Sequence, residues 1–83
     1  MPRYMDMHHE VDGLTAEMVE GAHARDVAVQ GAHGVSYLKY WYDEGSGRLF
    51  CLVEAPSKEA ASAVHREAHG LVADELTQVV EGR

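Results

Sequence analysis

The chain has few basic residues. Lys and Arg contribute only seven of its 83 residues, against 14 Asp and Glu, so the formal net charge is −7. Proteins that bind nucleic acid through its phosphates need a basic surface, and so do proteins that bind anionic membranes. The composition therefore argues against nucleic acids and membranes as partners, and it favours cations.

Long apolar runs and cysteines are scarce as well. No segment approaches the ~20 apolar residues that span a bilayer, and the first ten residues lack the apolar core of a signal peptide. Cys51 is the only cysteine, so the chain can form no internal disulfide and has no Cys-x-x-Cys loop of the copper-chaperone type. A lone thiol fits a reducing compartment. We expect a cytoplasmic protein in which Cys51 is a small buried apolar residue.

Histidine, in contrast, is abundant, with six residues in this short chain: His8, His9, His23, His33, His65 and His69. His65 and His69 are one helical turn apart, and a helix places such i and i+4 side chains on one face with Cβ atoms about 5–6 Å apart. Two imidazoles in that arrangement can bind one transition-metal ion. Because histidine is frequent and cysteine is not, we expect nitrogen and oxygen ligands rather than thiolates.

The apolar periodicity and the turn residues predict a single domain over residues 1–83, of the α+β class. Strands are expected over residues 2–10, 35–42, 48–55 and 77–81, with one helix capped by Thr15 and a second capped by Ser57. The order βαββαβ is that of the ferredoxin-like fold, an antiparallel sheet with two helices on one face. The core of so short a chain is thin, and an oligomer or a bound metal would add stability.

Both faces of the predicted sheet are apolar. The second strand is expected to divide its side chains between the faces, Val35, Tyr37 and Trp41 on one and Leu38, Tyr40 and Tyr42 on the other. The third strand alternates in the same way. Two helices cover only one face, and an exposed apolar face is unusual in a soluble monomer. We therefore expect a homodimer in which two sheets pack together as a dimeric α/β barrel.

The ferredoxin-like topology brings the histidines of the first strand and of the second helix to the same end of the domain. His9 shares its strand face with Met5 and Met7, and this apolar pair is expected to face the helices. His9 is therefore the expected partner of His65 and His69 in one metal site.

His8 and Asp6 alternate with these residues and are expected to face the barrel interior, as candidates for a second site shared between subunits. Because strands often end in a bulge, both His8 and His9 are kept as candidates. His23, midway along the first helix, is a candidate ligand or else a buried imidazole bonded to Asp26; Asp26 in turn is an orienting carboxylate or simply an exposed one. The candidate ligands are His65, His69, His9, His8, His23 and Asp6.

Five segments together resemble a family of small bacterial nickel-binding proteins that was first catalogued as a domain of unknown function. These segments are Met5–His8, Ala22–Asp26, Tyr40–Glu44, Phe50–Pro56 and Ala63–Leu71. They extend over essentially the whole chain, and the His-Arg-Glu-Ala-His-Gly and Cys-Leu-Val-Glu-Ala-Pro runs are the specific part. The resemblance implies a ferredoxin-like dimer that binds nickel(II) through histidines.

We therefore expect a nickel(II)-binding protein for sequestration, trafficking or sensing, and not an enzyme. The same ligands would hold copper(II) more tightly and zinc(II) comparably. Neutral imidazole is the ligating form, so binding should weaken below about pH 6.5. The alternative function is a cofactor-independent oxygenase or isomerase of the dimeric α/β-barrel type, with His23, Asp26, Tyr40 or His65 as acid or base. The sequence offers no legible set of nucleophile, base and orienting group for it.

Overall fold

The strands and helices follow one another in the predicted βαββαβ order in the computed structural model, which describes residues 1–82. The elements are β1 (Arg3–His8), α1 (Ala16–Val29), the short 3₁₀ helix η1 (Gln30–His33), β2 (Ser36–Asp43), β3 (Arg48–Glu54), α2 (Lys58–Ala68) and β4 (Glu75–Val79). The last strand begins two residues earlier than expected. The α+β class and the two helices are as predicted.

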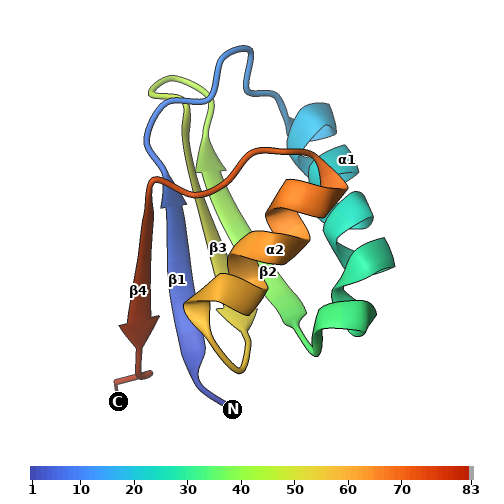
Figure 1. The fold of residues 1–83 in the computed structure, drawn as a ribbon. Helices are drawn as coiled ribbons and strands as arrows, with labels where there is room; N and C mark the ends of the chain where they lie inside the picture. The colour runs from blue at the N-terminus through green and yellow to red at the C-terminus, as the bar shows by residue number, and fades with distance from the viewer. Residues whose placement is uncertain (83) are drawn as a thin grey trace.

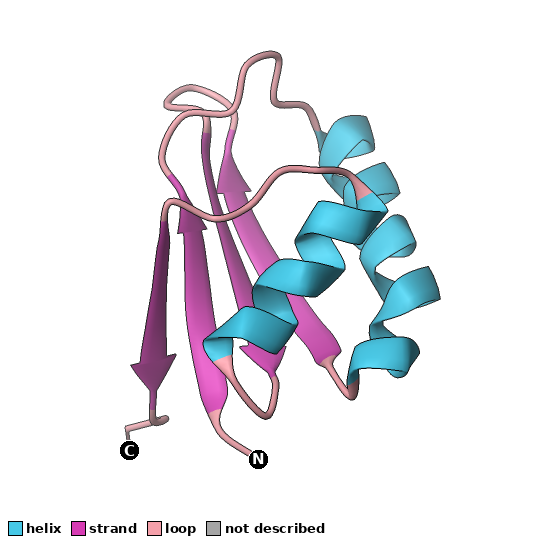
Figure 2. Ribbon diagram, viewed as in Figure 1, coloured by secondary structure: helices cyan, strands magenta, loops and turns pink. Residues whose placement is uncertain are grey.

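The four strands form one sheet in the order β2-β3-β1-β4, with every neighbouring pair antiparallel. Both helices lie on the same face of this sheet, and α2 crosses in front of its central strands (Figures 1 and 2). The other face is left open. None of the helices within the described residues is long and apolar enough to cross a membrane.

Local chemistry fixes where the helices begin and where α2 ends. The Thr15 hydroxyl accepts a hydrogen bond from the backbone N–H three residues on, at 3.2 Å, and the Ser57 hydroxyl does the same at 3.1 Å. At the end of α2 the N–H groups of His69 and Gly70 both donate to the carbonyl of His65, at 3.0 and 2.8 Å. Gly70 has φ +79°, a conformation that favours glycine and turns the chain toward β4.

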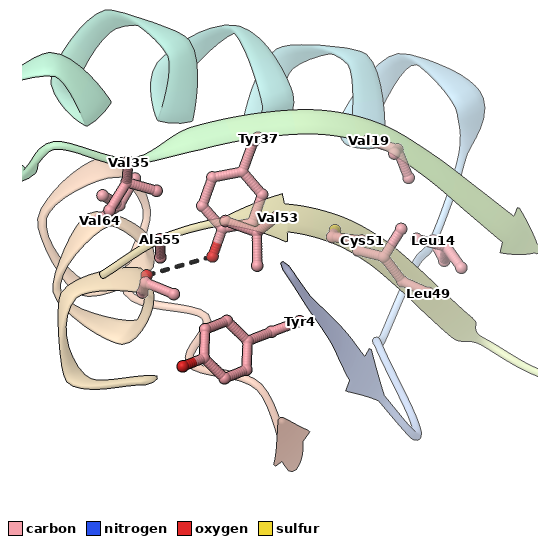
Figure 3. Packing of buried hydrophobic residues seen from close by; sticks show 11 residues of the cluster. Tyr4, Leu14, Val19, Val35, Tyr37, Leu49, Cys51, Val53, Ala55 and Val64 are labelled. Carbon is pink, nitrogen blue, oxygen red and sulfur yellow. Dashed lines mark hydrogen bonds between the residues drawn. The ribbon is translucent and has the colours of Figure 1, made fainter. Parts of the chain in front are cut away.

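The apolar core lies between the helices and the covered face of the sheet (Figure 3). Val53 from β3 and Val64 from α2 are fully buried at its centre. Tyr37 from β2 projects into the same layer, and its hydroxyl donates to the carbonyl of Ala61 on α2 at 3.1 Å, drawn as the dashed line in Figure 3. This bond ties α2 to the sheet one turn before His65.

The two faces of β1 are the reverse of those expected. Tyr4, Asp6 and His8 are buried beneath the helices, whereas Met5 and Met7 lie half-buried on the open face. The alternation has the predicted period, but the prediction assumed that the methionines would be buried in preference to charged side chains. Exchanging the faces of a strand takes a shift of only one residue. Here an ion pair with His65 on α2 keeps Asp6 inside, and His8 lies within ion-pair distance of Asp6 on the same strand.

The expected faces of β2 are also wrong, because the strand contains a register shift between Tyr37 and Lys39. Tyr37 is opposite Val53, Leu38 is the extra residue, and Tyr40 is opposite Cys51. Such an extra residue changes the face of everything that follows. Tyr37 and Tyr40 therefore share the covered face, and Trp41, which was expected beside Tyr37, lies on the open face and is 49% exposed.

Candidate metal centre

Four ligand-type side chains meet between the sheet and α2. Asp6 and His8 come from β1, Cys51 from β3 and His65 from α2, and each offers one ligand atom within 4.8 Å of the others. We call these four residues the buried cluster, since each is buried. The sheet register places three of the four: Asp6 is directly opposite Cys51, and His8 is two residues further along the same face of β1.

Three nitrogen and oxygen atoms of the buried cluster have no hydrogen-bond partner among the described residues: Oδ1 of Asp6, Nε2 of His8 and Nε2 of His65. Nε2 of His65 lies 2.7 Å from Oδ2 of Asp6, and Nε2 of His8 lies 3.4 Å from Oδ1 of Asp6. These are ion-pair distances, but neither pair has the alignment of a hydrogen bond. Unpartnered buried polar atoms are rare in proteins, and three of them in one place fit the donor atoms of a metal site.

Asp26, in the last turn of α1, contacts the ring nitrogen of His65 that faces away from Asp6. Its Oδ1 is hydrogen-bonded to Nδ1 of His65 at 2.9 Å and lies 3.1 Å from Nε2 of His69. His65 in α2 and His69 at its C-cap thus converge on a carboxylate from the neighbouring helix. A carboxylate that bonds one ring nitrogen while the other nitrogen faces the ligand group is the usual support of a metal-binding histidine. Asp26, His65 and His69 are also close enough to hold an ion themselves.

The charges of the site are set by these ion pairs. Burial lowers the pKa of His65, but the hydrogen bond to Asp26 and the adjacent negative charge of Asp6 outweigh it and raise that pKa to about 9. Burial raises the pKa of Asp6, but His65 and His8 outweigh it and hold the pKa at about 2. Burial opposes ionisation of Asp26 too, and its bonds to His65 and His69 lower its pKa nevertheless. Two buried carboxylates therefore flank one imidazolium.

Tyr37 contacts both Asp6 and His65. Its hydroxyl lies 3.0 Å from Oδ2 of Asp6, besides its contact with the Ala61 carbonyl, and its ring stacks on His65 with centroids 4.5 Å apart. Burial and then the charge of Asp6 raise the pKa of the Tyr37 hydroxyl. It therefore stays protonated and acts as a donor. Its contacts fix the positions of both Asp6 and His65.

A cavity of about 20 Å³ lies against the cluster, between α1, α2 and the sheet. The polar side chains that line it are His8, His23, Asp26, Tyr40, Cys51, His65 and His69. A single water molecule needs roughly 10–15 Å³ of such space, whereas sites for organic ligands typically measure about 300–1,000 Å³. The cavity has room for an ion or a water molecule, and it is far too small for an organic substrate.

The structure brings together some of the predicted ligands and separates others. Asp6, His8 and His65 meet directly, and His69 adjoins them through Asp26. His23 lines the same cavity, with its ring 5.0 Å from that of Tyr40, but it belongs to neither ligand group.

The prediction for His9 is wrong. It was expected to face the helices beside His65 and His69. It follows the end of β1, is exposed, and pairs with the carboxylate of Glu75 on the edge strand β4. Its backbone N–H donates to the carboxylate of Asp74 at 2.8 Å. His8 takes the inward place that was expected for His9.

The roles of three residues of the site were not predicted from the sequence. Cys51 was expected to be an apolar filler and Tyr37 to be sheet packing. Asp26 was expected to be an orienting carboxylate near His23 or an exposed one, and its contacts with His65 and His69 were not predicted. Asp26 is one of two buried residues of α1, and the other is Val19. A buried Asp needs partners, and the histidines of α2 are the nearest candidates in the topology.

The fold and the site define a small ferredoxin-like protein that encloses imidazole, carboxylate and thiol groups under its helices. More particularly, residues 4–79 match the family model described as "Nickel responsive protein SCO4226-like", so the chain belongs to that family. It is similar to SCO4226 from Streptomyces coelicolor A3(2), whose crystal structure has 37% sequence identity to it and a TM-score of 0.90. The match covers 98% of this chain and 99% of that one. A search of curated proteins found no match.

Proposed function

We propose that the chain binds nickel(II) through Asp6, His8 and His65. The observation that carries this proposal is the group of three buried ligand atoms without hydrogen-bond partners among the described residues. Imidazole nitrogen and carboxylate oxygen are ligands that nickel(II) accepts, although copper(II) binds such sites more tightly and zinc(II) comparably. The nickel-responsive family to which the chain belongs favours nickel as the physiological ion.

The charges support a divalent cation as the ligand. Asp6 and Asp26 bring two negative charges into the interior, and the proton on His65 offsets only one of them. A metal ion would take the place of that proton, because only the free Nε2 lone pair can coordinate. Because the pKa of His65 is raised to about 9, protons compete with nickel for this imidazole up to a higher pH than they would for an ordinary histidine. Nickel affinity should therefore keep rising with pH up to about 9.

We further propose that the role is to bind nickel for sequestration, transfer or sensing in the cytoplasm, and that the chain is not an enzyme. A cavity of about 20 Å³ supports an ion as the occupant over an organic substrate. His65, with its pKa raised to about 9, would suit a general acid, but an acid needs a substrate within reach. A lone reduced thiol is also in keeping with the cytoplasm.

Calorimetric titration with nickel tests the site, using protein purified without a histidine tag. We expect one ion per chain in the buried cluster and an affinity at least about tenfold weaker in His8→Ala. His33→Ala is the matched control, because His33 pairs with Glu67 outside the cluster. Circular dichroism verifies that both variants are folded. Unchanged affinity in His8→Ala would remove the buried cluster as the nickel site.

We also propose that the chain is a homodimer through the open face of its sheet, as in a dimeric α/β barrel. A hollow of about 240 Å³ on this face is lined by half-buried Met5, Leu52 and Val79 and by exposed Trp41. A contiguous apolar face of this kind is typical of a protein–protein interface. Light scattering should give twice the chain mass of 9.1 kDa. A monomer at micromolar concentration would contradict this proposal.

A further inference from the structure

Cys51 lies inside the ligand group, where an inert filler was expected. It sits in the middle of β3 directly opposite Asp6, and only 6% of it is exposed. Its sulfur is within 4.8 Å of the ligand atoms of Asp6, His8 and His65. Because it is the only cysteine of the chain, it cannot serve as half of an internal disulfide.

The neighbours of the thiol provide the independent observation. Oδ1 of Asp6 and Nε2 of His8 belong to side chains that are only 1% and 5% exposed, and neither atom has a hydrogen-bond partner among the described residues. A cysteine that merely filled space would be surrounded by apolar atoms or by satisfied polar groups. Here the sulfur completes a set of four donor atoms, which is the number that closed metal sites use.

We propose that Cys51 is a ligand of the metal ion in the buried cluster, through its thiolate, together with Asp6, His8 and His65. This inference rests on the proposed function and names a fourth donor for that same site. On binding, the S–H bond breaks, a metal–sulfur bond forms, and the proton leaves to solvent. No electron is transferred, so no oxidant or reductant is needed.

In the metal-free protein the Cys51 thiol is protonated and unreactive. Burial, followed by the charge of Asp6, raises the pKa of Cys51, so the thiol is protonated and a poor nucleophile. A divalent ion reverses that balance, because coordination to a metal deprotonates a thiol. A nitrogen, oxygen and sulfur donor set would also disfavour Mg²⁺, Ca²⁺ and Mn²⁺, which prefer oxygen ligands, relative to nickel, copper and zinc.

The test is nickel titration of the whole chain followed by ultraviolet–visible absorption. We expect a sulfur-to-nickel charge-transfer band that grows to one equivalent in the wild type and is absent in Cys51→Ser. Nickel affinity in Cys51→Ser should fall at least about tenfold. Val53→Ala, two residues along the same buried face, is the control that disturbs packing but keeps the sulfur.

The outcomes separate this inference from the proposed function. Stoichiometric binding to the cluster without the band would overturn the thiolate ligand and leave the nickel site in place. The absence of binding in the wild type would overturn both. Should Cys51→Ser fail to fold, X-ray absorption at the nickel edge on the wild type decides alone. A sulfur neighbour of the nickel supports the proposal, and a shell of only nitrogen and oxygen contradicts it.

Discussion

Successive residues of β1 alternate between two very different surroundings. Asp6 and His8 point under the helices, where their side chains are 1% and 5% exposed, while Met5 and Met7 lie half-buried on the open face. Antiparallel sheets with one solvated face usually show the opposite division, with apolar residues inside and polar residues outside. This strand therefore shows that alternation fixes which residues share a face, but not which face is buried.

The cost of the two faces differs as well. Burying a charge is expensive unless it is paired and hydrogen-bonded, and a buried ion pair rarely adds net stability compared with apolar residues. An apolar open face carries no such penalty for burying charge, and a second chain can cover it. The covered face thus contains buried ion pairs that reduce its contribution to stability, whereas the open face is apolar and partly exposed.

The largest expected effect comes from breaking the ion pairs on the covered face. Asp6→Ala leaves His65 without one of its two carboxylates and should lower the free energy of unfolding by about 3–5 kcal/mol. It should also remove nickel binding, because it deletes a donor atom. Urea denaturation at pH 7 measures the first effect and calorimetry the second.

Asp12→Ala is the matched control for this comparison, because Asp12 is an exposed carboxylate in the loop before α1. It should change both quantities little. If Asp6→Ala were as stable as the wild type, the buried ion pairs would not be holding the covered face together.

Much of the fold was predictable from local chemistry. Thr15 and Ser57 are strong helix caps, and the glycine-rich turn before Arg48 marks a hairpin, so the order of elements followed directly. The same topology predicted correctly that His8 and His65 lie at one end of the domain. These inferences needed only the apolar periodicity, the helix-capping residues and the direction of the chain in each element.

The details of the site were not predictable, for two physical reasons. The extra residue at Leu38 reverses the later faces of β2, and a bulge leaves no local signal in this sequence. Whether Asp6 points inward depends on partners that are distant in the chain, His65 above all. Tertiary pairing of this kind overrides the apolar alternation, which considers one strand at a time.

The second effect is a dependence of stability on pH in the metal-free protein. The pKa of His65 is about 9 in the folded chain, against 6.5 for an ordinary histidine, so the folded state holds this proton more tightly. The resulting stability is fully present below about pH 6.5 and is lost as the pH rises through about 9. The difference in pKa corresponds to about 3 kcal/mol.

Urea denaturation at several pH values between about 6 and 10, with a chelator present, measures this decline. His33→Ala should decline as the wild type does, whereas Asp6→Asn, which removes one carboxylate charge beside His65, should decline less. A stability that stays flat across this range in the wild type would mean that His65 is not held as an imidazolium.

The third effect tests the open face. Trp41→Ala removes the largest exposed apolar side chain of that face and should weaken the proposed dimer by about 2 kcal/mol, or roughly 30-fold in its dissociation constant. Nickel affinity per chain should be unchanged, because Trp41 lies on the side of the sheet away from the cluster. Sedimentation equilibrium gives the dissociation constant, and Val27→Ala, on α1, is the exposed apolar control. Equal dissociation constants for the two variants would place the interface elsewhere.

The smallest effect is expected at His9, and it separates the two neighbouring histidines. His9 pairs with Glu75 at an exposed position, with both side chains 52% exposed, and such pairs contribute only about 0–1 kcal/mol. His9→Ala should therefore change stability by less than about 1 kcal/mol and nickel affinity by less than about threefold, whereas His8→Ala should change affinity at least about tenfold. The two substitutions remove the same group from adjacent residues. A difference between them therefore shows that the side chain must lie on the covered face to affect nickel binding. If His9→Ala weakened nickel binding as much as His8→Ala, the ion would bind at the end of β1 and not beneath the helices.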